Sequence, residues 1–292
     1  MTWHTSDRVI TLRDKSRPFD ITVEMLDGWR RHLSGRDASL ISFYGFLSIF
    51  PLALAATTVL GIVLDGNEDL QQRVTNGAFD NIPLIGDSLS NNPDPGGSIH
   101  VLILGLSGAL WSGSRAFVAI HHAQDDCWEV SINDRAKTPV IRGRALLGIA
   151  ILGGAQLGAM VLAGIVHGAS LSAIGDLGII ASAVLVNIVS TLLIMRLLVS
   201  ITPTWSDLWL GAVTAGVIVT ALQHFSTALA KYFTERASAT YGSFAVVLGL
   251  VTWLGLMAIA SLMCVEFNAA RTRLSDPDAV RRGERFDVAI AP

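Results

Sequence analysis

Long uncharged runs separated by polar segments dominate the pattern of hydrophobic and polar positions along the chain. Residues 38–64 carry no charge, and residues 145–175 carry none apart from His167 if it is protonated. A helix rises about 1.5 Å per residue and needs roughly 20 apolar residues to cross about 30 Å of hydrocarbon. The pattern therefore predicts an all-α integral membrane protein with six transmembrane helices. The spans are expected at about 38–64, 98–120, 145–167, 177–196, 208–230 and 240–266.

A shorter helix with a different pattern is predicted before the first span, with Asp20 as its N-cap. Its apolar positions recur at helical spacing, at Val23, Leu26, Trp29 and Leu33. Three basic residues, Arg30, Arg31 and Arg36, lie along the same segment. Such a basic amphipathic helix commonly lies in the headgroup plane, so we expect an interfacial helix. Packing against a cytoplasmic part of the same protein would give the same pattern.

The basic residues are distributed unevenly between the connections. Of the 21 Lys and Arg residues, 17 lie in the N-terminal segment, near 135–144, at Arg196 or in the tail. The loop at 65–97 is acidic, with Arg73 as its one basic residue. Because cytoplasmic loops are enriched in Lys and Arg, both termini are expected in the cytoplasm. We therefore divide the chain into a cytoplasmic segment (1–37), a six-helix domain (38–270) and a cytoplasmic tail (271–292).

The overall composition agrees with a membrane protein. The chain is 51% hydrophobic and 15% charged, with a mean hydropathy of +0.51, whereas soluble domains carry about 25% charged residues. Cys127 and Cys264 both fall on the predicted cytoplasmic side, where a structural disulfide is not expected. The first 37 residues carry seven basic side chains and no apolar core, so the first span is expected to direct insertion.

Ionisable side chains within spans are candidates for substrate binding. Arg115 is expected near the inner end of the second span, about one turn before the helix emerges. An arginine at a helix centre costs on the order of 2.5 to 3.5 kcal/mol, so it should snorkel, pair or face a wet cavity. A lipid phosphate and a substrate remain alternative partners. Glu266, near the inner end of the sixth span, is a second candidate, and a pairing between Glu266 and Arg115 is one hypothesis.

Other polar residues in the spans could line an interior, namely Asn187, Gln223, His224 and Asn268. Interhelical hydrogen bonding, worth about 0.6 kcal/mol on average, is the alternative for each. Pro51 is expected to kink the first span as a hinge, with Ser48 available to satisfy the backbone locally. The pair Gly154 and Gly158 has a spacing typical of helix packing surfaces.

Two pairs of His and Asp residues near the end of the second span have the i, i+4 spacing that could hold a divalent metal. They are His121 with Asp125 and His122 with Asp126. A solvated helix end is the alternative. No cofactor is predicted, and no nucleic acid is expected as a partner because the chain lacks a basic face with stacking aromatic residues.

Four segments resemble the YihY/virulence factor BrkB family of six-span bacterial inner-membrane proteins, and in particular its YhjD-like branch. They are SFYGFLSIFPLAL, LWSGSRAF, TPTWSDLWLGAV and ATYGSFAVVLGLVTWLGLMAIASLMCVEFNA, and the resemblance covers about residues 38–270. The residues that match the family's pattern are Ser48, Pro51, Arg115, Tyr241, Gly242, Glu266 and Asn268. Where the family has proline and glycine at the start of the fifth span, this chain has Leu210 and Gly211.

The resemblance implies an inner-membrane transporter or flippase-like protein for envelope lipid or another anionic amphiphile, with membrane lipids as partners and Tyr241 added to the candidate site. The family's old label, ribonuclease BN, implies instead a metal-dependent hydrolase at the membrane. The sequence lacks a clustered HxHxDH motif and a GxSxG elbow, so no enzymatic activity is expected. A non-catalytic scaffold and a homo-oligomer remain open alternatives.

Overall fold

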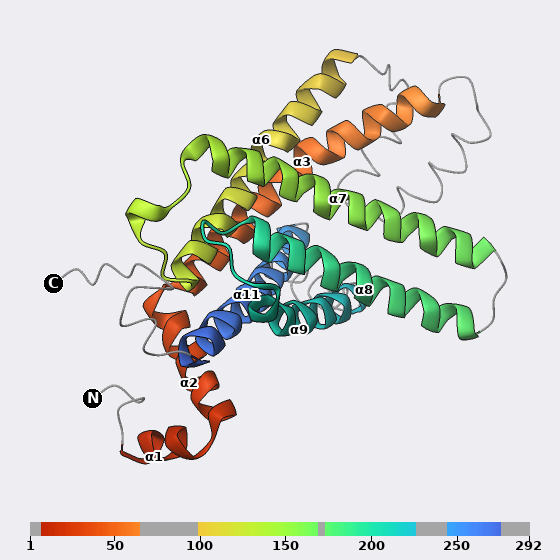
Figure 1. Cartoon of the computed structure of the whole chain (residues 1–292). Helices are drawn as coiled ribbons and strands as arrows, with labels where there is room; N and C mark the ends of the chain where they lie inside the picture. Colours follow the sequence, from red (N-terminus) through yellow and green to blue (C-terminus); the bar gives the residue numbers. More distant parts are fainter. Residues whose placement is uncertain (1–6, 65–98, 169–172, 226–243, 276–292) are drawn as a thin grey trace.

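The computed structural model describes residues 7–64, 99–168, 173–225 and 244–275, and within these ranges all regular secondary structure is helical (Figure 1). Two helices precede the predicted spans, α1 (Asp7–Lys15) and α2 (Arg17–Arg31). Six long helices follow, α3 (Ser34–Leu64), α6 (Ile99–Cys127), α7 (Thr138–Gly168), α8 (Ala173–Leu197), α9 (Trp205–His224) and α11 (Phe244–Ser275). A short 3₁₀ turn, η2 (Ile132–Asp134), lies between α6 and α7. The all-α prediction is confirmed.

Five described helices are long and apolar enough to cross a membrane, namely α6, α7, α8, α9 and α11. The first predicted span corresponds to α3, which is 31 residues long. Large apolar side chains point outward from these helices, and Leu104, Trp111 and Leu185 are 68%, 62% and 61% exposed. Such extensive exposed apolar surface is unfavourable in water and is expected where lipid surrounds the protein.

Seven helix termini meet at one end of the molecule, which we call the polar end. Ser34 at the start of α3 contacts Glu266 near the end of α11, and Arg273 of α11 donates to the carbonyl of Cys127 at the end of α6. The start of α7 and the end of α8 meet through Arg144, whose Nη1 donates to the carbonyl of Val199 at 2.6 Å. The start of α9 and the end of α2 lie here too. Successive long helices therefore run in alternating directions, as six successive membrane crossings require.

The N-terminal helix α2 packs against the bundle, mainly on α11. Val23 is 2% exposed, and Trp29 packs against a buried cluster formed by α3, α6 and α11. Leu26 is 37% exposed, and Leu33 lies beyond the helix at φ 57°. The apolar stripe of α2 is thus divided between the bundle and the outer surface. Val23 and Trp29 pack within the protein, as in the alternative given in the sequence analysis, whereas Leu26 and Leu33 face outward.

The predicted N-cap of α2 was wrong. The helix begins at Arg17, after Ser16, and Pro18 occupies its first turn, where the fixed φ of proline favours helix initiation. Asp20 lies inside the first turn and accepts a hydrogen bond from Arg13 Nε at 2.5 Å. The carboxylate therefore joins α2 to α1 instead of capping α2.

Pro51 lies inside α3, which continues as a helix on both sides of it. Ser48 Oγ donates to the carbonyl of Gly45 at 2.6 Å, and not to the carbonyl of Leu47, which the proline leaves without its helical partner. A Cβ on Gly108 of α6 would lie 3.1 Å from Pro51 Cβ. The proline thus packs closely against Gly108 of α6. Its predicted role as a hinge stays a prediction.

Candidate functional site

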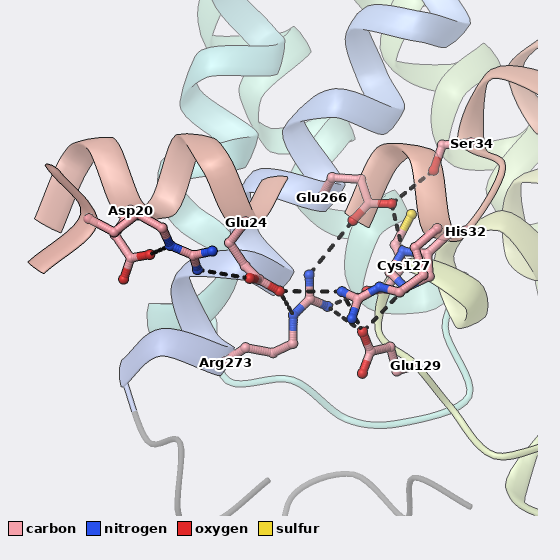
Figure 2. Close-up of polar contacts among 10 residues, drawn as sticks. Asp20, Glu24, His32, Ser34, Cys127, Glu129, Glu266 and Arg273 are labelled. Atoms are coloured by element: carbon pink, nitrogen blue, oxygen red, sulfur yellow. Dashed lines mark hydrogen bonds and ion pairs between the residues drawn. The ribbon is translucent and has the colours of Figure 1, made fainter. Parts of the chain in front are cut away.

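A buried carboxylate organises the polar end (Figure 2). Glu266 of α11 is 0% exposed, and its Oε1 accepts a hydrogen bond from Ser34 Oγ at 2.8 Å. His32, in the turn between α2 and α3, places Nδ1 2.8 Å from the same oxygen. Glu266 therefore holds the connection between α2 and α3 against the last long helix.

Arg273, two turns further along α11, lies among three carboxylates. Its guanidinium nitrogens lie 3.4 Å from Glu24 Oε1, 3.5 Å from Glu129 Oε1 and 3.9 Å from Glu266 Oε2. Arg31 of α2 adds a contact of 3.0 Å to Glu129. We call these residues, with His32 and Ser34, the Glu266 cluster. It joins α2, α3, the segment after α6, and α11.

The charges of the Glu266 cluster balance when His32 is protonated, because three carboxylates then face two arginines and one imidazolium. Burial raises the pKa of Glu129, but hydrogen bonding from His32 and the charges of Arg273 and Arg31 outweigh it and lower that pKa to about 2. Burial lowers the pKa of His32, whereas hydrogen bonds to Glu129 and Glu266 raise it, and the net direction is upward. The surroundings thus favour the charged form of both groups.

A glycine makes room for this arrangement. A Cβ on Gly28 of α2 would lie only 2.7 Å from Glu266 Oε2 and 3.2 Å from Arg273 Nη2. Glycine within a helix costs about 1 kcal/mol relative to alanine, so a glycine in the last turn of α2, three residues before its end, calls for a packing explanation. The close approach of the Glu266 carboxylate supplies that explanation.

Arg115 lies elsewhere, on the exposed surface of α6. Its guanidinium carbon is 5.0 Å from the centre of the Trp111 ring and 5.9 Å from that of Tyr44 in α3. The hypothesis that Arg115 pairs with Glu266 was wrong, because Glu266 is held by His32, Ser34 and Arg273. The helix α6 continues for twelve residues beyond Arg115, about 18 Å, to Cys127, while the predicted emergence from the membrane one turn after Arg115 stays a prediction.

Three helices share a polar network between their apolar surfaces. Asn187 of α8 is 4% exposed, and its amide donates to Thr220 Oγ1 at 2.9 Å and to Gln223 Oε1 at 2.8 Å, both on α9. Gln156 of α7 donates to Asn187 Oδ1 at 3.2 Å. These contacts are the interhelical hydrogen bonding that the sequence analysis gave as the alternative to substrate binding. His224, one residue beyond Gln223, is exposed, and Tyr241 lies outside the described residues.

Asn268 joins α9 to α11. It is 0% exposed, its Oδ1 accepts from the Gly211 backbone N–H at 2.8 Å, and its Nδ2 donates to the Leu208 carbonyl at 2.9 Å. A Cβ on Gly211 would overlap the Asn268 side chain. Position 211 therefore has no room for a side chain, which explains why a glycine follows Leu210 here. The contacts of Asn268 hold α9 against α11 and are structural.

The two predicted His and Asp pairs do not converge. Asp125 Oδ1 accepts a hydrogen bond from the Ser200 backbone N–H at 2.7 Å, and its Oδ2 accepts one from Ser200 Oγ at 2.8 Å. His121 Nε2 lies 3.5 Å from the same Oδ2. Asp126 instead pairs with Arg135 at 2.5 Å, and His122 is exposed. Within the described ranges, no three His, Cys, Asp or Glu residues are close enough together to hold a metal ion. Asp125 attaches the connection between α8 and α9 to α6.

Sequence reasoning missed five members of the Glu266 cluster, namely Glu24, His32, Ser34, Glu129 and Arg273. Each lies in a polar segment outside the predicted spans, where a polar side chain is expected to be solvated. One signal was available in Gly28, a glycine inside a predicted amphipathic helix, which often marks a close packing contact.

Together these features define the protein as a multi-pass, all-helical membrane protein with paired polar groups between its helices. Comparison with family models gives the more particular assignment. The model described as Virulence factor BrkB matches residues 26–286, so the chain belongs to that family. A search of curated proteins and a search of solved structures found no match.

Proposed function

We propose that the protein is an inner-membrane transporter or flippase-like protein that moves an anionic amphiphile of the cell envelope, and that it is not an enzyme. In this proposal the chain crosses the membrane six times, the polar end faces the cytoplasm, and Arg115 binds the anionic headgroup. The Glu266 cluster holds α2 on the bundle at the cytoplasmic surface.

The position of Arg115 is the observation that carries the proposal. Side chains on a helix lean toward its N-terminus, and the Arg115 guanidinium lies over Trp111, one turn nearer to Ile99. The charge is thus directed away from the polar end, along a surface on which Trp111 itself is 62% exposed. Snorkelling toward the polar end would require the opposite direction.

The lack of a carboxylate near Arg115 in the described residues also supports its proposed role in binding an anionic headgroup. Within this described part of the chain, Arg115 makes no ion pair or hydrogen bond, and its guanidinium lies over the rings of Trp111 and Tyr44. A cation over an aromatic ring gains about 0.5–1 kcal/mol at an exposed site, less than the 2.5 to 3.5 kcal/mol that an arginine costs at the centre of a membrane helix. An anionic headgroup drawn to this surface would neutralise the charge and supply the missing hydrogen bonds.

The proposal is tested by reconstituting the full-length protein in vesicles that carry a fluorescent phosphatidylglycerol, and measuring how fast the label becomes accessible to a membrane-impermeant quencher. A hydrogen bond to a charged group contributes about 1.5–3 kcal/mol, and each 1.4 kcal/mol is a factor of ten. Arg115→Ala is therefore expected to reduce the rate about tenfold or more, with a smaller loss in Arg115→Lys.

Arg142→Ala is the matched control, since Arg142 is an exposed arginine at the start of α7. We expect its rate to equal that of the wild type. Wild-type transport in Arg115→Ala would remove Arg115 from the mechanism and leave the proposal without its main support.

A further inference from the structure

An apolar groove runs between α9 and α11, whereas the rings that contact Arg115 belong to α3 and α6. Its volume is about 480 Å³, and α2 contributes Met25 to its lining. Ile218 and Leu222 of α9 form one wall, and Leu256 and Met263 of α11 form the other. The hydroxyl of Thr214, also in the lining, does not make the groove polar, because it donates to backbone carbonyls of its own helix at 2.9 and 3.0 Å.

The depth of the groove matches one leaflet. Along α11 its lining extends from Leu256 to Phe267, eleven residues or about 16 Å of helix. Half of a hydrocarbon core of about 30 Å is about 15 Å. Phe267 follows Glu266 directly, so the groove begins beside the polar end and reaches about as deep as an acyl chain of that leaflet.

A cation lies at the end of the groove nearest the polar end. Arg271 is one helical turn beyond Phe267 and therefore on the same face of α11. Its Nη1 donates to the carbonyl of Ser206, at the start of α9, at 3.1 Å. In the described part of the chain Arg271 pairs with no carboxylate, so its charge is not neutralised by the protein.

We propose that this groove binds one acyl chain of an anionic phospholipid, with the phosphate against Arg271. This is a site for a resident lipid, separate from the transport path proposed at Arg115. A second copy of the chain fits less well, because a two-fold contact through the groove would bring Arg271 against Arg271 of the partner without an anion between them.

The test measures lipid retained by the purified full-length protein in mild detergent, by native mass spectrometry after delipidation and addition of either phosphatidylglycerol or phosphatidylcholine. The wild type is expected to retain one phosphatidylglycerol and to prefer it over phosphatidylcholine roughly fivefold, the factor expected for one basic residue near an anionic surface. Arg271→Gln should abolish the preference, and Ala260→Trp, which fills the groove, should abolish retention of both lipids.

Leu185→Trp is the matched control for the added bulk, since Leu185 is exposed on α8 outside the groove. It should retain lipid like the wild type. Arg271→Gln should transport at the wild-type rate in the quencher assay, so that loss of transport and loss of this site are distinguishable. Equal retention of phosphatidylglycerol by wild type and Ala260→Trp would overturn the proposal. A dimer that disappears in Ala260→Trp, without any change in lipid retention, would assign the groove to a second copy instead. If Ala260→Trp does not fold, the loss of preference in Arg271→Gln decides the question.

Discussion

Glu266 illustrates how a charge at the edge of a membrane domain is stabilised by partners distant in sequence. A buried carboxylate loses several kcal/mol of hydration, and removing one partner from a buried pair typically costs about 3–5 kcal/mol. Here the partners are His32, Ser34 and Arg273, and they come from both ends of the chain. The same interactions that neutralise Glu266 therefore also fasten α2 to the bundle.

The stability of the docked α2 should depend on pH through His32 and Glu129. The pKa of His32 is raised above its usual 6.5, so its contribution is fully present below about pH 6.5 and is lost as the pH rises through the raised pKa. The pKa of Glu129 is lowered from 4.5 to about 2, so its contribution is present above about pH 4.5 and is lost as the pH falls toward 2. Thermal unfolding in detergent should therefore show the highest midpoint between about pH 4.5 and 6.5.

His32→Gln tests the alkaline side of this profile. The variant should unfold at a lower temperature than the wild type near pH 6, and the difference should shrink as the pH rises above the raised pKa. In Glu129→Gln, the unfolding temperature should fall less than that of the wild type as the pH drops below about 4.5. Parallel profiles for wild type and His32→Gln over pH 6–9 would show that His32 does not titrate as proposed.

Among the helices, α9 is positioned by glycines that allow direct backbone contact. A Cβ on Gly216 would lie 2.7 Å from the backbone nitrogen of Ile188 in α8, and a Cβ on Gly211 would overlap Asn268 of α11. Small residues at such crossings allow membrane helices to approach closely and gain packing contacts. By contrast, a Cβ on Gly153, Gly154 or Gly158 of α7 would meet nothing within 4 Å. The prediction of a packing surface at Gly154 and Gly158 was therefore wrong for contacts with the described residues of this chain.

This contrast gives a paired test of helix packing. Gly211→Ala should displace the Asn268 amide, breaking its hydrogen bonds to Gly211 and Leu208, and should destabilise the protein by about 1–3 kcal/mol. Gly153→Ala, at an open helical position, should leave the unfolding temperature unchanged or slightly raised. The measurement is thermal unfolding of both variants in the same detergent. Equal midpoints for the two would mean that the α9–α11 contact does not limit stability.

At the scale of the whole molecule, the long helices alternate in direction and share one polar end (Figure 1). The starts of α3, α7 and α9 meet the ends of α6, α8 and α11 there, through contacts such as Ser34 with Glu266 and Ser200 with Asp125. In the described part of the chain, most Lys and Arg residues lie in the segments of this end, and such an asymmetry orients membrane proteins. The proposed topology, six crossings with both termini in the cytoplasm, rests on these two observations.

Labelling of engineered cysteines checks this topology. In a chain whose Cys127 and Cys264 are replaced by alanine, a cysteine at position 135 should react with an impermeant thiol reagent only after the cytoplasm is made accessible. A cysteine at position 66, which lies outside the described residues, should react in intact cells. Labelling of both positions from the same side would contradict six crossings, and with them the assignment of the polar end to the cytoplasm.

The sequence by itself determined the helical class and the positions of the long helices, because membrane insertion depends on the hydrophobicity of a continuous segment of about 20 residues. Boundaries were less accurate, as Asp20 shows, because a proline in the first turn competes with a capping side chain. Only the tertiary structure decided the partners of the polar groups. Glu266 and His32 are 234 residues apart, and Asn187, Asn268 and Asp125 likewise pair with distant helices. Such pairings depend on which faces of the helices pack together, which the hydropathy of each segment does not specify.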